Sequence, residues 1–381
     1  MRVGIDGSNL RQGGGVTHLV QLLAAAEPQE AGIETVIVWG APALLDCLPA
    51  RPWLDCRRDP HLQGGAGTRA YWQQIRLTTL ARESADLLFV PGGTYLGRFH
   101  PFVTMFRNML PFDSAERAHY GLSGMRMKLE VLRHVQTLTF RRADGVIFLT
   151  EHARRRIMET TRVRGLEAVI PHGLDSRFFR AIPSRLVEYS PDRPFRWLYV
   201  SAFYRYKHPW NVVEALAMLR KEGAPMVLDL VGPLHPRVKD RLEDTIRRLD
   251  PEGKFVNVIP PVAHEELPAV YHGADAFVFA STCENLPNSL LEAMAAGLPI
   301  VSSQHPPMPD ILGDAGVYCD PEIPASIAGA MKRLWQNPEL RARIATAAQE
   351  RAKAYDWRTC ARTTFMLLAQ TRHHTAGQAG S

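Results

Sequence analysis

The sequence has few cysteines and no long apolar run. Its five cysteines are odd in number and never spaced as Cys-x-x-Cys, which indicates neither a disulfide framework nor a zinc site. No run approaches the roughly 18 apolar residues of a membrane helix, and the first residues do not form the apolar stretch of a signal peptide. No Gly-x-Gly-x-x-Gly opens either half of the chain, which disfavours a dehydrogenase. The expected compartment is a reducing cytoplasm.

Positive charge is concentrated in one region rather than spread. The formal net charge of the chain is +6, and residues 126–164 alone hold ten basic residues against four acidic ones. In the first part of this region the basic residues are interleaved with apolar ones, among them Met127 and Val131. That pattern is compatible with peripheral docking on anionic lipid head groups, and the alternative is a solvated helix face. Nucleic acid is a weaker candidate, because the region has little aromatic interleaving.

Length and periodicity predict two α/β domains. A chain of 381 residues is about twice the usual domain length. Short apolar runs such as Leu87–Val90 and Ala276–Phe279 alternate with helical stretches in both halves, which is typical of parallel sheets covered on both faces. Residues 184–194, rich in proline and charge, break the pattern and are expected to form a linker. The predicted domains are therefore 1–183 and 195–356.

The most informative segment runs from Thr282 to Val301. Pro287 opposes helix before it, and Asn288 or Ser289 can cap a helix that is expected to end before Gly297. Glu292 is then predicted to lie in the first turn of this helix, with Glu284 in the preceding loop. A helix start suits a phosphate and nearby carboxylates suit sugar hydroxyls, which together predict a sugar-nucleotide pocket. In the alternative, Ser289-x-x-Glu292 is a capping box in which Glu292 only satisfies a backbone N–H.

A wider pattern supports the first interpretation. Glu-x7-Glu followed by Ala-Met-Ala-x-Gly-x-Pro-Ile-Val resembles the donor-binding signature of the family 4 ("group 1") retaining glycosyltransferases. Three further blocks resemble this family in the same order: the glycines Gly13 to Gly15, the segment Ile170 to Asp175, and the segment Val200 to Lys207. The resemblance implies a GT-B fold, with two Rossmann-like, doubly wound domains facing each other across a cleft. It also implies that a terminal helix, about 357–370, returns to the first domain; the tail from Thr371 is expected to be unordered.

The resemblance further implies roles for residues of the second domain. Glu292 would hold the ribose and Glu284 the transferred sugar, while Lys207 and Arg205 would bind the diphosphate. The family often has an arginine where this chain has Ser201. Backbone N–H groups would come from the segment after Glu284, which comprises Asn285, Leu286, Pro287, Asn288 and Ser289. No cofactor is implied beyond the nucleoside-diphosphate sugar as co-substrate, and the lack of an Asp-x-Asp element near the phosphate site indicates metal-independent transfer.

The first domain departs from the family pattern at one place. Many relatives have a histidine where this chain has Arg107 and Asn108. Because arginine cannot act as a general base near neutral pH, the departure favours a retaining reaction on one face of the sugar, in which the donor phosphate takes the acceptor proton. The loop containing Gly14 and Gly15 would face the donor diphosphate and the acceptor, and His172 would lie at the floor of the cleft.

The resemblance implies a glycosyltransferase that moves a hexose from a GDP- or UDP-sugar to a glycan or lipid-linked acceptor in cell-surface polysaccharide biosynthesis. The expected location is the cytoplasm, with contact at the inner face of the membrane through residues 126–164. The alternatives are a GT-B sugar-nucleotide epimerase, a phosphorylase, and a binding protein for nucleotide sugars without catalysis. The donor base, the sugar and the acceptor cannot be read from the sequence.

Overall fold

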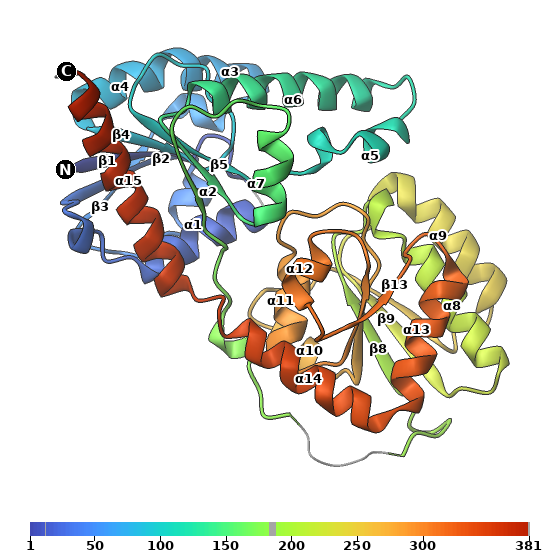
Figure 1. Ribbon diagram of the computed structural model, residues 1–381. Helices are drawn as coiled ribbons and strands as arrows, with labels where there is room; N and C mark the ends of the chain where they lie inside the picture. The colour runs from blue at the N-terminus through green and yellow to red at the C-terminus, as the bar shows by residue number, and fades with distance from the viewer. Residues whose placement is uncertain (12, 183–187, 380–381) are drawn as a thin grey trace. The chain divides into compact units, whose positions relative to one another are not determined.

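The chain divides into two compact units that each contain one parallel sheet (Figure 1). The structure is a computed structural model that describes all residues except 12, 183–187, 380 and 381. Unit 1 comprises Met1–Gly173 and Tyr355–Ser381, and unit 2 comprises Leu174–Ala354. Among the described residues, no helix is both long enough and apolar enough to span a bilayer.

Unit 1 is built on a seven-stranded sheet with the order β3-β2-β1-β4-β5-β6-β7. Its strands are β1 (Arg2–Asp6), β2 (Thr35–Gly40), β3 (Leu54–Arg58), β4 (Leu87–Val90), β5 (Phe102–Phe106), β6 (Gly145–Phe148) and β7 (Leu166–Val169). Its α-helices are α1 (Gly14–Ala25), α2 (Pro42–Leu45), α3 (Ala66–Tyr71), α4 (Leu77–Ser84), α5 (Ser114–Ala118), α6 (Gly124–Arg142), α7 (Glu151–Met158) and α15 (Trp357–Ala379). A π-helical segment, η3 (Trp72–Arg76), joins α3 to α4.

Unit 2 repeats the plan with a six-stranded sheet in the order β10-β9-β8-β11-β12-β13. Its strands are β8 (Phe195–Val200), β9 (Met226–Val231), β10 (Val256–Ile259), β11 (Ala276–Phe279), β12 (Ile300–Ser303) and β13 (Val317–Cys319). Its α-helices are α8 (Pro209–Lys221), α9 (Pro236–Leu249), α10 (Leu267–His272), α11 (Asn288–Ala295), α12 (Met308–Leu312), α13 (Pro324–Gln336) and α14 (Pro338–Ala352). Two short 3-10 helices, η5 (Ser176–Phe178) and η6 (Arg205–Lys207), complete the parts used below.

The central strands explain why the apolar runs fold this way. Every residue of β4, β5, β6, β9 and β11 is buried, as expected for parallel strands with helices on both faces. In each sheet the strand order reverses beside the first strand, between β1 and β4 in unit 1 and between β8 and β11 in unit 2. The loops that follow these four strands therefore flank the two switch points, where open α/β sheets bind ligands.

The division between the units lies at 173/174, not after residue 183 as the sequence suggested. Residues after Gly173 already pack on unit 2, because Arg180 donates from Nε to Ala296 O (3.0 Å) and Gln349 Nε2 donates to Arg180 O (2.8 Å). Of the expected linker, residues 184–187 lie outside the described residues. Tyr189, in the described part, donates to Asp275 Oδ1 at 3.1 Å and so also belongs to unit 2.

The final helix is longer than expected. The sequence predicted a helix over about 357–370 and an unordered tail from Thr371, but α15 continues to Ala379 and packs against α1 in unit 1 (Figure 1, red). No proline interrupts residues 371–379, and Thr371 is buried, with its Oγ1 donating to Leu367 O at 2.8 Å. The helix also returns to unit 1 at Tyr355 rather than after residue 356.

Candidate active site

In unit 2, the loops that follow β8 and β11 are joined to each other at the switch point. Thr282 N donates to Tyr206 O at 2.9 Å, and the Thr282 hydroxyl lies 3.3 Å from His208 Nε2. His208 adopts the left-handed conformation, with φ of 45°, which ends η6 and starts α8. The two loops therefore form one layer over the carboxyl ends of adjacent strands, and the predicted site residues of unit 2 lie on or next to it.

A buried ion pair connects the two loops. Lys207 Nζ donates to Glu284 Oε1, and the two side chains are only 10% and 12% exposed. The ammonium group also lies 5.0 Å from the ring centre of Phe279, and the Tyr199 hydroxyl donates to Lys207 O at 2.8 Å. Burial, together with the charge of Glu284, raises the pKa of Tyr199 well above its usual value, so its hydroxyl stays protonated. Removing one partner of such a pair costs about 3–5 kcal/mol, because the other charge is left buried and alone.

Arg205 brings a second cation to the same layer. It lies in η6, two residues before Lys207, and its Nη1 is buried without a hydrogen-bond partner in the part of the chain that the structure describes. Ser201, where the family often has an arginine, is buried at the end of β8, and its hydroxyl donates to Ala202 O at 3.2 Å. A buried guanidinium nitrogen without an acceptor is costly, so this site is suited to a ligand that supplies one.

The helix after Glu284 begins two residues earlier than a Ser289 cap would require, and one residue earlier than an Asn288 cap would require. Pro287 is the N-cap, in extended conformation and without a side-chain cap, and Asn288 is the first helical residue. Asn288 is exposed, whereas Asn285 and Leu286 are buried. Leu290 N is the first helix amide bonded back to the cap, at 3.2 Å from Pro287 O, so the N–H groups of Asn288 and Ser289 have no backbone acceptor among the described residues. The expectation that Asn288 or Ser289 caps this helix was wrong.

Glu292 is the fifth residue of α11, one or two residues further in than expected and just past the first turn, and it does not close a capping box. Its Oε2 instead accepts from the hydroxyl of Tyr271, in α10, at 2.7 Å. Burial, reinforced by the charge of Asp175, raises the pKa of Glu292 to about 7, although the Tyr271 hydrogen bond opposes the shift. No donor among the described residues bonds its other oxygen, Oε1. One buried carboxylate oxygen is thus held in place while the second remains available.

The predicted residues of unit 1 gather at its own switch point. α1 begins at Gly14 rather than near Thr17, so Gly14 and Gly15 form its first turn. Arg107 follows β5, and its Nη1 lies 3.0 Å from the position that a Cβ on Gly15 would occupy. Burial lowers the pKa of Arg107 to about 10. Asn108 is exposed, and its Oδ1 accepts from Leu110 N at 3.1 Å.

His172 also belongs to unit 1, in a cluster of rings that the sequence did not reveal. Its ring is stacked on Trp357, with centroids 6.1 Å apart, and His18 meets Trp357 edge-on at 5.3 Å. Both ring nitrogens of His18 are buried without a hydrogen-bond partner in the described residues. Burial and the charge of Arg107 lower the pKa of His18 well below its usual value, so the imidazole is neutral. The sequence contains one signal for this cluster, which is the position of His18 on the apolar face of α1, the helix that begins at Gly14.

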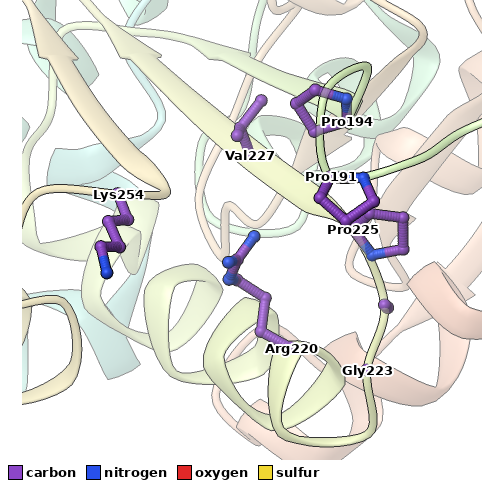
Figure 2. Close-up of a pocket in the computed structure, with 8 residues that line it drawn as sticks. Pro191, Pro194, Arg220, Gly223, Pro225, Val227 and Lys254 are labelled. Carbon is purple, nitrogen blue, oxygen red and sulfur yellow. The ribbon is translucent and has the colours of Figure 1, made fainter.

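One cavity of unit 2 lies elsewhere. It measures about 460 Å³ and is lined by Pro191, Pro194, Arg220, Gly223, Ala224, Pro225, Val227 and Lys254 (Figure 2). Pro194 and Pro225 precede β8 and β9, which places the cavity at the amino-terminal edge of the sheet. None of the predicted site residues lines it, since they follow the carboxyl ends of the strands.

Comparison with known proteins connects unit 2 with a family. Residues 185–351, which make up most of unit 2, match the model of the family "Glycosyl transferases group 1". In this part the chain belongs to the group 1 glycosyltransferases. Its fold is GT-B: it aligns with sucrose-phosphate synthase from Thermosynechococcus elongatus at a TM-score of 0.74 and 18% identity, covering 97% of this chain and 98% of that one. It aligns with Anabaena Alr3699/HepE, solved in complex with UDP-glucose, at 0.68 and 19%, covering 99% and 100%.

Curated relatives of this chain differ in the reactions that their names give. The O-antigen chain mannosyltransferase B of Escherichia coli is 24% identical over 295 residues, which is 74% of each chain. A glycogen synthase of Mycobacterium tuberculosis is 33% identical over 179 residues, 46% of this chain and 42% of that enzyme. For seven further curated relatives, the chain spans between 19% and 60% of their length.

The raised pKa of Glu292 predicts a pH-dependent stability. Between its usual value of 4.5 and about 7, the folded protein binds a proton that the unfolded chain has released, so stability falls as pH rises through this window. Glu292→Gln keeps an acceptor for Tyr271 but has no charge to bury. Urea unfolding at pH 5 and pH 8 should show the wild type losing up to roughly 3 kcal/mol more than this variant. If the wild type and Glu292→Gln lose the same free energy of unfolding between pH 5 and pH 8, the raised pKa of Glu292 is contradicted.

Proposed function

We propose that this glycosyltransferase is a retaining, metal-independent enzyme. It transfers a hexose from a GDP- or UDP-sugar to a glycan or lipid-linked acceptor in cell-surface polysaccharide biosynthesis. The observation that carries the proposal is the layer at the unit 2 switch point, where Lys207, Arg205 and Glu284 meet the free start of α11. The similarity to an O-antigen mannosyltransferase supports a glycan acceptor, and the structural likeness to a protein solved with UDP-glucose is compatible with such a donor.

The donor nucleotide is assigned to unit 2. Glu292 binds the ribose through Oε1, because Tyr271 already holds Oε2, and a carboxylate can accept from both hydroxyls of a diol. The diphosphate lies at the segment Asn285 to Ser289 and contacts the backbone N–H groups of Asn288 and Ser289 at the start of α11, where the helix dipole favours negative charge. Ser201 borders the same site at the end of β8. No cofactor is needed, since the nucleotide sugar is itself a substrate.

Lys207 and Arg205 neutralise the leaving diphosphate, which makes a metal ion unnecessary. The unpaired Nη1 of Arg205 supplies a donor for phosphate oxygen. Lys207 has a double role, because its ammonium group also fixes Glu284, whose carboxylate accepts hydrogen bonds from the transferred sugar. Fixed charges aimed at a leaving group are the largest usual source of catalysis in a water-excluded site. Transfer should therefore continue in the presence of EDTA.

The reaction retains configuration at the sugar. The bond between the anomeric carbon and the phosphate oxygen breaks, and a bond from the acceptor oxygen forms on the same face. The acceptor proton passes to the leaving diphosphate. Arg107 and Asn108 stand where a base from unit 1 would be expected, and a guanidinium cannot accept this proton. Arg107 and Asn108 instead form hydrogen bonds with the sugar or a phosphate, beside Gly14 and Gly15. His172 packs against His18 of α1, the helix that begins at these glycines.

Unit 1 also offers a surface for a peripheral membrane contact in the cytoplasm. On α6, Met127, Val131 and Leu138 are 71%, 59% and 44% exposed, and they lie on one stripe of the helix because they are four and seven residues apart. Lys128 and Arg141 flank the stripe. On α7, by contrast, Arg154 and Arg156 form ion pairs with acidic residues. Within the basic region 126–164, we therefore assign the membrane contact to α6. A helix with apolar and basic exposed side chains binds the surface of anionic bilayers.

The two glutamates should separate binding from turnover. Glu292→Ala removes the ribose contact and should weaken nucleotide binding about 10- to 100-fold by calorimetry. Glu284→Gln keeps the shape of the side chain but weakens the hold on the sugar, and should lower kcat about 100-fold with little change in nucleotide affinity. Glu243→Ala, at an exposed position of α9, is the control. Unchanged kinetics in both site variants would refute the proposal; a requirement for free phosphate would indicate a phosphorylase.

The membrane contact can be tested by co-sedimentation with lipid vesicles. The double variant Met127→Ser/Val131→Ser should bind vesicles containing phosphatidylglycerol about 10-fold more weakly than the wild type, because it loses apolar area at the bilayer surface. Met218→Ser/Ile323→Ser changes two exposed apolar residues of unit 2 and should bind like the wild type. If the wild type binds neutral phosphatidylcholine vesicles equally well, or none at all, the proposed contact is wrong.

A further inference from the structure

Three arginines of unit 1 lie near two loops that contain glycine, the loop after β1 with Gly13 and the loop after β3 with Gly64. They are Arg107, Arg11 and Arg69. Arg107 follows β5 and lies against Gly15. Arg11 follows β1, and its Nη2 donates to Leu62 O at 3.3 Å, in the loop after β3. Arg69 donates from Nη1 to Gly64 O, in the same loop, at 2.8 Å. These three strands are parallel, so the loops at their carboxyl ends share one edge of the sheet.

None of the three guanidinium groups forms an ion pair in the described part of the chain. Arg107 is half-buried and has no hydrogen-bond partner there, and Nε of Arg69 is buried and unpartnered. Arg11 and Arg69 use one nitrogen each on a backbone carbonyl. An unpaired guanidinium removed from water is costly, which applies to Arg107 and Arg69. Arg11 is exposed and adds a solvated cation at the same edge, so all three are available to an anionic ligand.

The two acids nearest in the chain to this edge do not neutralise the arginines. Asp59 accepts from Arg76 Nε at 2.7 Å and from His61 Nδ1 at 2.8 Å, so its charge is already compensated. Asp6 accepts from Ser8 N and Gln73 Nε2 inside the sheet, where burial raises its pKa. The neighbouring His18 is neutral. The edge therefore has a net positive charge.

The backbone makes room for a ligand beside these cations. A Cβ on Gly15 would lie 3.0 Å from the Arg107 guanidinium and 3.1 Å from Leu10, so a larger residue would displace these side chains by a few tenths of an ångström. Gly13 has a φ of 69°, and a Cβ there would meet nothing within 4 Å, so the space beside Gly13 is open. The amides at the start of this 12-residue helix add donors, and its N-cap has no side-chain bond.

We infer that this edge of unit 1 binds an anionic group of the acceptor, a phosphate or diphosphate, through Arg107, Arg11 and Arg69. The inference rests on the proposed transferase function and narrows its acceptor to a phosphorylated one. Arginine fits this task because its planar fork forms paired hydrogen bonds with phosphate oxygens. The phosphate can belong to a lipid diphosphate carrier or to a phosphorylated sugar, which present the same chemistry to the arginines.

Binding of small probes tests this without turnover. The intact protein, with UDP or GDP in excess to fill unit 2, is titrated calorimetrically with farnesyl diphosphate, with a hexose 6-phosphate and with the methyl hexoside. At least one phosphorylated probe should bind 10-fold or more tightly than the neutral sugar, and Arg107→Gln should weaken it about 10- to 100-fold. Arg11→Gln and Arg69→Gln should each weaken it several-fold. A preference for either phosphorylated probe supports the inference and identifies the source of the phosphate.

Matched variants keep the outcome interpretable. Arg82→Gln removes an exposed arginine of α4 and should bind every probe like the wild type. Arg107→Lys retains the positive charge and should retain part of the affinity, with an unchanged unfolding midpoint confirming that the site is intact. Equal binding of neutral and phosphorylated probes would overturn the inference. So would an Arg107→Gln protein that loses nucleotide affinity instead, because Arg107 would then contact the donor. Both outcomes leave the Glu292 and Glu284 test of the proposed function unaffected.

Discussion

The buried ion pair between Lys207 and Glu284 is the constraint on which the unit 2 site depends. It joins two loops that are 77 residues apart in the chain but follow adjacent strands, β8 and β11. Because neither charge is well solvated, the pair is stable only if both loops keep their positions. The same contact brings a cation and a carboxylate to the one place where the strand order reverses. Stability of the loops and chemistry of the site thus follow from a single interaction.

The two units differ in how the charged side chains at their switch points are paired. In unit 2 the Lys207 ammonium is paired with the Glu284 carboxylate, and burial raises the pKa of Glu292 to about 7. In unit 1 the charges at the corresponding switch point are unbalanced and positive. A balanced, buried pair suits a ligand that must be oriented and cleaved, whereas an unpaired positive edge suits a ligand that supplies its own negative charge. The proposed donor and acceptor assignments follow this difference.

Local patterns in the sequence predicted the two sheets and the loop and helix that contain Glu284 and Glu292. Apolar runs and helix-breaking residues determine local structure over a few residues, so the sequence shows them directly. The helix cap lies at Pro287, one or two residues before the expected cap, so Glu292 lies one or two residues deeper in the helix, where Tyr271 is its partner. That contact, like the His18, His172 and Trp357 cluster, joins residues distant in sequence, and no local pattern encodes it. The extension of α15 was missed for the same reason, since burial of Thr371 depends on the sheet it packs against.

The most direct test of the account is thermal stabilisation of the purified protein by UDP, GDP, ADP and dTDP. A ligand that binds only the folded state raises the unfolding temperature, and at about 100 times its Kd it contributes about 2.7 kcal/mol. The account predicts a rise with UDP or GDP that disappears in the Glu292→Ala protein. If none of the four nucleotides stabilises the wild type, or if the rise persists in that variant, the layer formed by Lys207, Glu284 and α11 is not a nucleotide site.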